Sequence, residues 1–320
     1  MKLPWRKDPA KKLSLTKAAQ LINVAEVPDS RGEDQARGSA ILAKHGVERS
    51  ELGDLAKLPP FRPVIVKLMK LFDGEDVSAA EVTRLVESDA ALTADLLAVV
   101  NSALYSLRAP VTSPLQAVNI LGFGTVKSLA AAIGMRGMAQ GAARTPVVRR
   151  FWLHSLATAT IAQNLCPLFH LNTHEVYVDA LLHDLGRLGL LAAHPQEYSA
   201  LALAAYENAA DVLEAEQSKL GMTHCKAGSL LCRAWFLSES VRRVAERHHD
   251  RNCTDDVVAF VQFCCRLANG LDYPTVLRRD REKPEDTIAQ FAPKELWETL
   301  DGRTKEVRDA IDAAIKAFDF

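Results

Sequence analysis

The stretch Val178–Leu191, VDALLHDLGRLGLL, decides how the rest of the chain is interpreted. It places a His-Asp pair, His183 and Asp184, inside an otherwise apolar segment whose leucines recur at helical spacing. We expect a buried helix here, with Gly186 leaving room beside the His183 imidazole. Neighbours on a regular helix point in different directions, so the pair alone is a poor chelate. The buried stripe would consist of Leu181, Leu182, Leu185 and Leu188.

Histidines elsewhere in the chain could join this pair. His154 lies in the amphipathic segment RRFWLHSLATATIAQNL, His224 follows a glycine, and His248-His249 ends a helical pattern. Several imidazoles and carboxylates that converge on one point can hold a divalent ion that activates water and polarises phosphate. The alternative is a set of core histidines held by local hydrogen bonds. The candidate ligands are His154, His183 and Asp184, with Arg187, His224, His248 and His249 as candidate pocket residues.

Composition narrows the class of protein. The chain has 320 residues, of which 48% are hydrophobic and 25% charged, with a formal net charge of −1. This balance is typical of a soluble globular protein and gives no general attraction to nucleic acid. We find no apolar run near the ~18 residues that span a bilayer. The six cysteines form no C-x-x-C pair, which favours reduced, buried thiols and a cytoplasmic location.

Helical periodicity predicts an all-α fold with negligible sheet. Residues 1–56 form a polar N-terminal extension, of which 1–40 should be dispensable for folding of the core. The dense apolar pattern of 57–270 should hold that core, as an N-terminal lobe (57–145) and a second lobe (146–270). Residues 271–320 begin with a Pro- and charge-rich loop and should end in docked terminal helices.

Several local signals mark helix ends. Ser78 to Glu81 and Ser113 to Gln116 have the spacing of capping boxes, and Asp89 fits an N-cap. Gly122 and Gly124 should end the helix that starts at Pro114. Asn101 could hold a left-handed turn at the end of the preceding helix.

The segment SPLQAVNILGFGTVKSLAAAIGM resembles a helix-turn-helix, which raises the question of DNA binding. A recognition helix needs polar and basic side chains that reach base edges. The second helix offers one lysine, Lys127, and is otherwise apolar. We therefore expect it to pack in the core and expect no sequence-specific DNA binding.

Six segments taken together resemble the HDOD family, the HD-related output domain group of bacterial signalling proteins. They span roughly residues 57–255 and are LPPFRPVIVKLMKL, VESDAALTADLLAVVNSALY, SPLQAVNILGFGTVKSLA, FWLHSLATATIAQ, DALLHDLGRLGLL and RAWFLSESVRRVAERHH. The resemblance implies a helical bundle like that of the HD phosphohydrolases, with a smaller N-terminal helical lobe. It also implies a regulatory or scaffolding role, because catalysis is often lost in this group.

The resemblance assigns His154, His183 and Asp184 to the first three positions of the pattern His…His-Asp…Asp. The fourth position falls in VQFCCRLA, where Cys265 stands in place of the expected aspartate. A thiolate suits zinc or iron better than magnesium or manganese. The substitution argues against a conventional phosphohydrolase and leaves open a weakly bound divalent metal.

We therefore expect a signalling output module that is not catalytic and that acts by binding a signalling protein partner. One alternative is a metal-dependent phosphohydrolase acting on a nucleotide or cyclic dinucleotide. A second alternative is a sensor that binds a nucleotide in the degenerate pocket without cleaving it. The sequence favours the first over the hydrolase because of Cys265.

Overall fold

The computed structural model describes residues 52–72, 74, 77–142, 145–206, 209–250, 252–278 and 283–318. All of them fall within one compact unit, Ile41–Phe320. Most of the predicted polar extension, including residues 1–40, lies outside these ranges, so its dispensability for folding stays a prediction.

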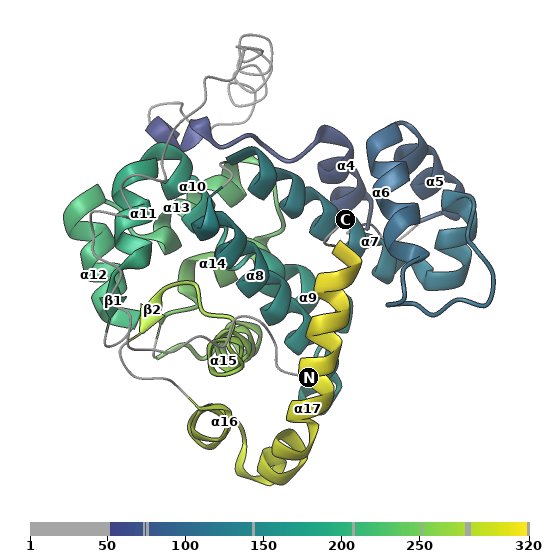
Figure 1. The fold of residues 1–320 in the computed structure, drawn as a ribbon. Coiled ribbons are helices and arrows are strands. Elements are labelled where there is room, and N and C mark those ends of the chain that lie inside the picture. The colour runs from purple at the N-terminus through teal and green to yellow at the C-terminus, as the bar shows by residue number, and fades with distance from the viewer. Residues whose placement is uncertain are drawn as a thin grey trace, which may run out of the picture. The chain divides into compact units, whose positions relative to one another are not determined.

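The fold is all-α, as the periodicity predicted (Figure 1). Its first helices are η1 (Gly53–Lys57), α4 (Pro63–Phe72), α5 (Ala79–Glu87), α6 (Ala90–Val100), α7 (Pro114–Ala142), α8 (Pro146–Leu165), η2 (Cys166–Phe169) and α9 (Thr173–Leu182). They are followed by α10 (Leu185–Ala193), α11 (Pro195–Leu203), α12 (Ala209–Leu220), α13 (His224–Ala234), α14 (Glu239–Arg247), α15 (Asp256–Gly270), α16 (Pro284–Phe291), η3 (Lys294–Leu296) and α17 (Trp297–Phe318). Two residues of β1 (Ala205–Tyr206) pair in parallel with two of β2 (Leu277–Arg278).

The helix starts follow the local signals in the sequence. The Ser78 hydroxyl accepts a hydrogen bond from the Glu81 N–H at 3.2 Å and donates one to the Glu81 carboxylate at 2.9 Å. Asp89 caps α6 by accepting from the N–H of Leu92 at 2.9 Å. The expected left-handed turn at Asn101 is wrong, because its φ is −85°. Its amide instead bonds both backbone groups of Val111, at 2.8 and 2.7 Å.

The long helix α7 is broken once, at Gly122, where φ is +78°. Gly124 does not end the helix as predicted, because it lies in the helical segment that follows. A Cβ on Gly124 would lie 2.1 Å from the His174 ring, so this glycine permits close packing against α9. Ser128 and most apolar residues of this second half are buried, which places the predicted second helix of the helix-turn-helix in the core.

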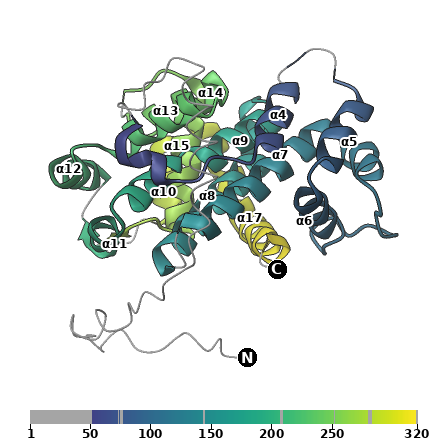
Figure 2. The ribbon, with the colours of Figure 1, turned by 90° about the horizontal axis from the view of Figure 1, so that it is seen from above.

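Helices α4, α5 and α6 pack on α7, and we call these four helices the N-terminal lobe. Among the helices that follow, which we call the HD lobe after the resemblance above, α8 contacts α9, α15 and α17, and α10 packs on α13. Figures 1 and 2 both place α8 between α10 and α17. The C-terminal helix reaches the other lobe, because Arg136 of α7 donates to the carbonyl of Phe318 at 3.0 Å. The predicted terminal helix is therefore docked.

One described helix, Pro114–Gln140, has the length and apolar character of a membrane span. Over half of its most apolar window, 56%, is buried against the rest of the protein. A core helix with many packing partners passes the same test, and this one contacts α4, α5, α6, α8 and α9. The described residues therefore contain no clear membrane span.

Candidate metal centre

The His-Asp pair lies at a break between two helices rather than inside one. α9 ends at Leu182, His183 is its C-cap, and Asp184 precedes α10 with φ −100° and ψ 17°. At this break the side chains of His183 and Asp184 are not limited to the directions that they would have on a regular helix. His183 and Asp184 are only 1% and 2% exposed. The pair can therefore contribute to one buried site, which a continuous helix would have prevented.

Two glycines bring this break against the start of α13. A Cβ on Gly186 would lie 1.9 Å from the carbonyl oxygen of His224 and 2.5 Å from the backbone nitrogen of Gly228. The predicted room beside the His183 imidazole is therefore wrong, since the backbone of α13 fills the space. This contact between backbones holds Asp184 close to His224.

Four imidazoles surround Asp184. The Nε2 atoms of His154 and His183 are 3.3 Å apart, and so are those of His224 and His248. Asp184 Oδ1 lies 3.3 Å from Nε2 of His224 and 3.2 Å from Nε2 of His248. The structure thus brings the predicted ligands and pocket histidines together.

His249 lies beside them, with its ring centroid 4.3 Å from that of His248 and 5.1 Å from that of His224. It is partly exposed, whereas the other four histidines are buried. It therefore stands on the outer side of the cluster.

The hydrogen bonds of the four inner rings fix their tautomers. Nδ1 of His154 donates to the carbonyl of Tyr273, at 2.6 Å, and Nδ1 of His183 to that of Ala180, at 2.6 Å. Nδ1 of His248 donates to the carbonyl of Ala245 at 3.1 Å, and Nδ1 of His224 to a carboxylate, described below. Carbonyls and carboxylates only accept, so each neutral ring carries its proton on Nδ1 and points a bare Nε2 inward.

This arrangement fits a cation. Two bare Nε2 atoms 3.3 Å apart repel each other unless a positive charge lies between them. Asp184 Oδ1 is buried and receives no hydrogen bond from the residues that the structure describes. Metal-binding histidines in proteins typically donate their other N–H to a carbonyl or carboxylate, as all four do here.

An ionic network supports the cluster from one side. The Arg187 guanidinium donates from Nε to Asp184 Oδ2 at 2.8 Å and from Nη1 to Glu216 Oε1 at 3.2 Å. Glu216 also accepts from Tyr198 at 2.8 Å and from Nδ1 of His224 at 2.7 Å. Arg187 therefore binds the carboxylates, and Glu216 orients His224. Neither Glu216 nor Tyr198 was predicted from the sequence as a site residue.

The electrostatics keep this site ready to bind a cation. Burial lowers the pKa values of His154, His183 and His224, so that these rings stay neutral at physiological pH. Burial alone would raise the pKa of Asp184, but the Arg187 guanidinium holds it well below its usual value. Burial also opposes ionisation of Glu216, yet His224 and Arg187 lower its pKa to about 2.

Two thiols approach the cluster, one at each end. Cys265 of α15 has its sulfur 3.4 Å from Nε2 of His154, and Cys225 of α13 has its sulfur 3.7 Å from Nε2 of His224. Cys265 thus occupies the side of the site where the sequence pattern placed it. Cys225 was not predicted as a site residue. All six cysteines are unbridged, and all but Cys253 are buried, as predicted.

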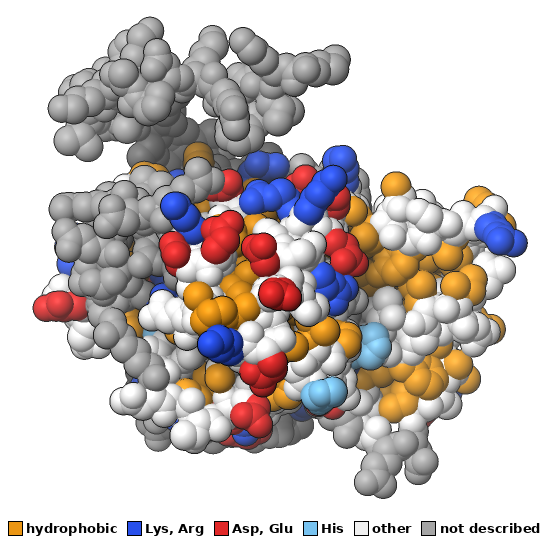
Figure 3. Space-filling model, turned by 90° about the horizontal axis from the view of Figure 1, so that it is seen from below, with side chains coloured by type: hydrophobic (Ala, Val, Ile, Leu, Met, Phe, Trp, Pro, Cys, Tyr) orange, Lys and Arg blue, Asp and Glu red, His pale blue; other side chains and the backbone are white. Residues whose placement is uncertain are grey.

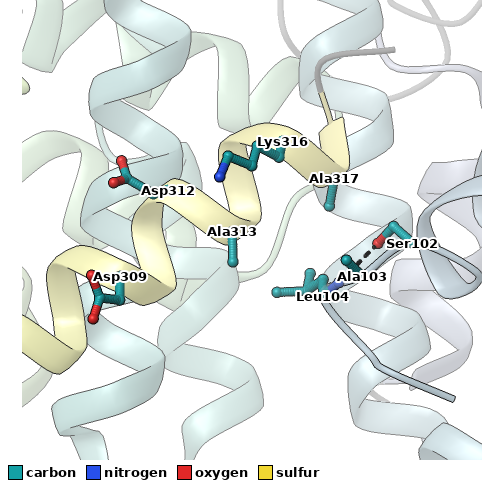
Figure 4. A pocket seen from close by; sticks show the side chains of 8 residues that line it. All are labelled: Ser102, Ala103, Leu104, Asp309, Asp312, Ala313, Lys316 and Ala317. Atoms are coloured by element: carbon teal, nitrogen blue, oxygen red, sulfur yellow. Dashed lines mark hydrogen bonds between the residues drawn. The ribbon is translucent and has the colours of Figure 1, made fainter. Parts of the chain in front are cut away.

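Two surface cavities lie outside this cluster. A groove of about 410 Å³ separates Ser102–Leu104 from α17, where Ala313 and Ala317 face Leu104 (Figure 4). Asp309 and Asp312 on its edge would repel a phosphate. A second cavity of about 320 Å³ is lined by Arg149, Arg150 and Tyr273 among others. None of the histidines of the cluster lines either cavity.

Comparison with known proteins identifies the family. The model of the HDOD domain family matches residues 58–251, and the chain belongs to this family. A curated relative, an uncharacterised protein of Treponema pallidum (strain Nichols), is 25% identical over 230 residues. The match covers 68% of this chain but 44% of that protein, so the chain spans less than half the length of this relative.

Solved structures share the fold. A protein from Shewanella amazonensis SB2B, proposed to be a phosphohydrolase, matches with a TM-score of 0.64 and 19% identity, over 84% of this chain and 98% of its own. A protein from Marinobacter aquaeolei VT8, proposed to act in signal transduction, matches with a TM-score of 0.63 and 18% identity, over 93% and 68% respectively. At such identities the likeness establishes the HD-like helical fold alone.

Proposed function

We propose that this HDOD protein is a signalling output module that is not catalytic, and that its histidine cluster is a buried metal centre with a structural or regulatory role. The observation that carries the proposal is burial. None of His154, His183, Asp184, His224 and His248 is more than 2% exposed. A phosphodiester would have to reach an ion inside this cluster, and its ligands offer no exposed surface.

The donor set supports the same conclusion. Hydrolysis in the HD pattern uses carboxylates to hold a hard cation and to orient the attacking hydroxide, and Cys265 replaces one of them. The remaining carboxylate, Asp184, already accepts a hydrogen bond from Arg187. A cation held by His183, Asp184 and His248, whose ligand atoms lie within 4.8 Å of one another, would link the α9–α10 break to the end of α14. Such a cation would stabilise the arrangement of the helices. It would also supply a Lewis acid, but one that a substrate could hardly reach.

The signalling partner would be a protein. Leu115 and Ile120, at the start of α7, are 45% and 55% exposed, and exposed apolar side chains that form a contiguous patch mark protein interaction sites. Figure 3, which views the molecule from below, shows hydrophobic side chains gathered over the N-terminal lobe, on the right.

We further propose that the lobes divide as 57–145 and 146–270, with 271–320 as an extension that carries α17.

A metal-dependent phosphohydrolase is the second candidate, favoured by the convergence of imidazoles on Asp184. The test is an assay of the purified protein on cyclic dinucleotides and on bis(p-nitrophenyl) phosphate, with manganese, magnesium, iron or zinc added. We expect no turnover above that of a His183→Ala control, and we expect bound metal by elemental analysis. Turnover that His183→Ala abolishes would establish the hydrolase instead.

A further inference from the structure

We propose that the metal centre is built for thiophilic divalent cations, zinc above all, through two ligand sets that each include a thiolate. One set is His154, His183 and Cys265, and the other is His224, Cys225, His248 and His249. Within each set the ligand atoms lie within 4.8 Å of one another. The inference rests on the proposed buried metal centre and names the class of cation that it holds.

The distances match tetrahedral zinc. Zinc–nitrogen bonds of about 2.05 Å and zinc–sulfur bonds of about 2.3 Å place two tetrahedral nitrogens about 3.3 Å apart and a nitrogen and a sulfur about 3.6 Å apart. The nitrogen pairs His154–His183 and His224–His248 are both at 3.3 Å. The Cys265 sulfur lies 3.4 Å from His154, and the Cys225 sulfur lies 3.7 Å from His224.

The position of the thiols follows from the helices that carry them. Cys225 is the second residue of α13, directly after His224, so the first turn of one helix offers both a nitrogen and a sulfur. Cys265 lies on α15, which packs on α8 and so faces His154. Their exposed fractions are 9% and 7%. Two buried thiols at opposite ends of one histidine cluster give each end its own soft ligand.

The charge balance favours thiolates as well. The cluster buries Asp184 and Glu216 against Arg187, which leaves one net negative charge among these groups at neutral pH. Divalent cations would leave this interior strongly positive unless further ligands ionise. A cysteine that coordinates a metal is deprotonated outright, so each thiol supplies a negative charge where its cation binds.

A hard cation would find a single carboxylate ligand here, Asp184, in a third group with His183 and His248. Magnesium and manganese prefer carboxylate, carbonyl and water oxygens, whereas imidazole and thiolate suit zinc, iron and cobalt. Asp184 is the carboxylate that faces the inward nitrogens, and its Oδ2 is already bonded to Arg187. Glu216 is directed to Arg187, Tyr198 and the Nδ1 side of His224. The site therefore discriminates against the ions that HD hydrolysis would use.

Cobalt(II) is the probe, because thiolate ligation gives it a charge-transfer band in the near ultraviolet that nitrogen and oxygen ligands do not give. We expect the full-length protein to show this band, with its intensity falling about twofold in Cys265→Ser and in Cys225→Ser and disappearing in the double variant. Cys232→Ser, which alters another buried thiol, should leave the band unchanged. Zinc should remove the band, whereas a large excess of magnesium should not.

The outcomes separate the two proposals. Cobalt bound without the band would overturn thiolate ligation while the buried metal centre stands. A band unchanged by one substitution would remove that cysteine from its set. No bound cobalt or zinc at all would overturn both proposals. If a variant fails to fold, thiol mapping of the unmodified protein decides: zinc should protect Cys225 and Cys265 from alkylation and leave Cys253 as reactive as before.

Discussion

The two lobes bury different kinds of side chain. The N-terminal lobe packs Leu68, Leu92 and Leu96 into a mostly apolar core, which the hydrophobic effect stabilises. The HD lobe instead buries Asp184, Arg187 and Glu216 together with its histidines. Buried charges cost free energy unless they are paired and hydrogen-bonded. The HD lobe therefore keeps buried charges that cost free energy of folding. A bound cation would explain why they are kept, whereas packing alone would not.

Arg187→Ala tests the cost of that interior and should have the largest effect. It leaves Asp184 and Glu216 buried without their cation, so the free energy of unfolding should fall by about 3–5 kcal/mol. Urea denaturation measures the change. The matched control is Arg242→Ala, which removes partly exposed bridges to Glu239 and Glu246 and should cost less than about 1 kcal/mol. Equal losses in the two variants would contradict the high cost assigned to the buried charges of the HD lobe.

Zinc should stabilise the HD lobe through its ligands. With free zinc at about 100 times its dissociation constant, the folded protein gains about 2.7 kcal/mol for each zinc ion bound. Thermal unfolding with zinc and with a chelator should therefore give clearly different midpoints. The double variant His154→Ala with His183→Ala should show a smaller zinc-dependent shift, even though its stability without metal also changes. Identical midpoints with zinc and with chelator would show that the centre binds no metal.

Asp179→Asn tests the contribution of one buried carboxyl of the HD lobe to the pH dependence of stability. This carboxyl accepts a hydrogen bond from the Ser240 hydroxyl at 2.7 Å. Burial raises the pKa of Asp179 from 3.8 to about 7. The folded state therefore binds more protons than the unfolded state between these values, and this carboxyl makes stability fall as pH rises. One proton is worth about 1.4 kcal/mol per pH unit, so roughly 2 kcal/mol should be lost between about pH 5 and 7.

The asparagine variant keeps the acceptor for Ser240 and cannot ionise. The histidines titrate in both proteins, so the difference between the two stability–pH curves belongs to Asp179. The curves should diverge toward neutral pH, with the variant the more stable. Parallel curves would mean that Asp179 ionises normally in the folded protein.

Asp89→Ala should have the smallest effect and belongs to the N-terminal lobe. It removes the N-cap of α6 and the ion pair with Arg62, at a cost of about 1 kcal/mol. Asp89→Asn retains a capping side chain and should lose less. The zinc-dependent shift should be the same in both variants as in the unmodified protein, since no ligand is touched. A changed shift would show that the lobes are energetically coupled.

The sequence predicted much of this architecture because its signals are local. Periodicity gave the all-α class, and the caps at Ser78 and Asp89 follow from side chains that bond their own helix. The family resemblance was confirmed over residues 58–251. The spacing of the histidines along the sequence identified them as candidate site residues, and the structure brings them together as expected. Whether they bind metal stays a prediction that the experiments above decide.

What the sequence did not reveal depends on contacts between distant segments. Glu216 lies in the polar segment DVLEAEQSKL, where a glutamate normally faces solvent, and nothing local marks it as the partner of Arg187 and His224. From the sequence, Cys225 has the features of a small core residue. Only the packing of α13 against α14 places it beside the histidines. The helix break at His183 was also missed, because the apolar pattern of Val178–Leu191 continues across it.

The contact of Gly186 with His224 means that the geometry of the centre depends on a missing atom. Loss of one ligand would weaken the cluster at one point, but a methyl group at position 186 would wedge α10 from α13 and shift several donors together. A catalogue of coordinating residues would overlook such a change. Transplanting this cluster into another helical bundle would therefore require Gly186 and Gly228 to be copied along with the histidines.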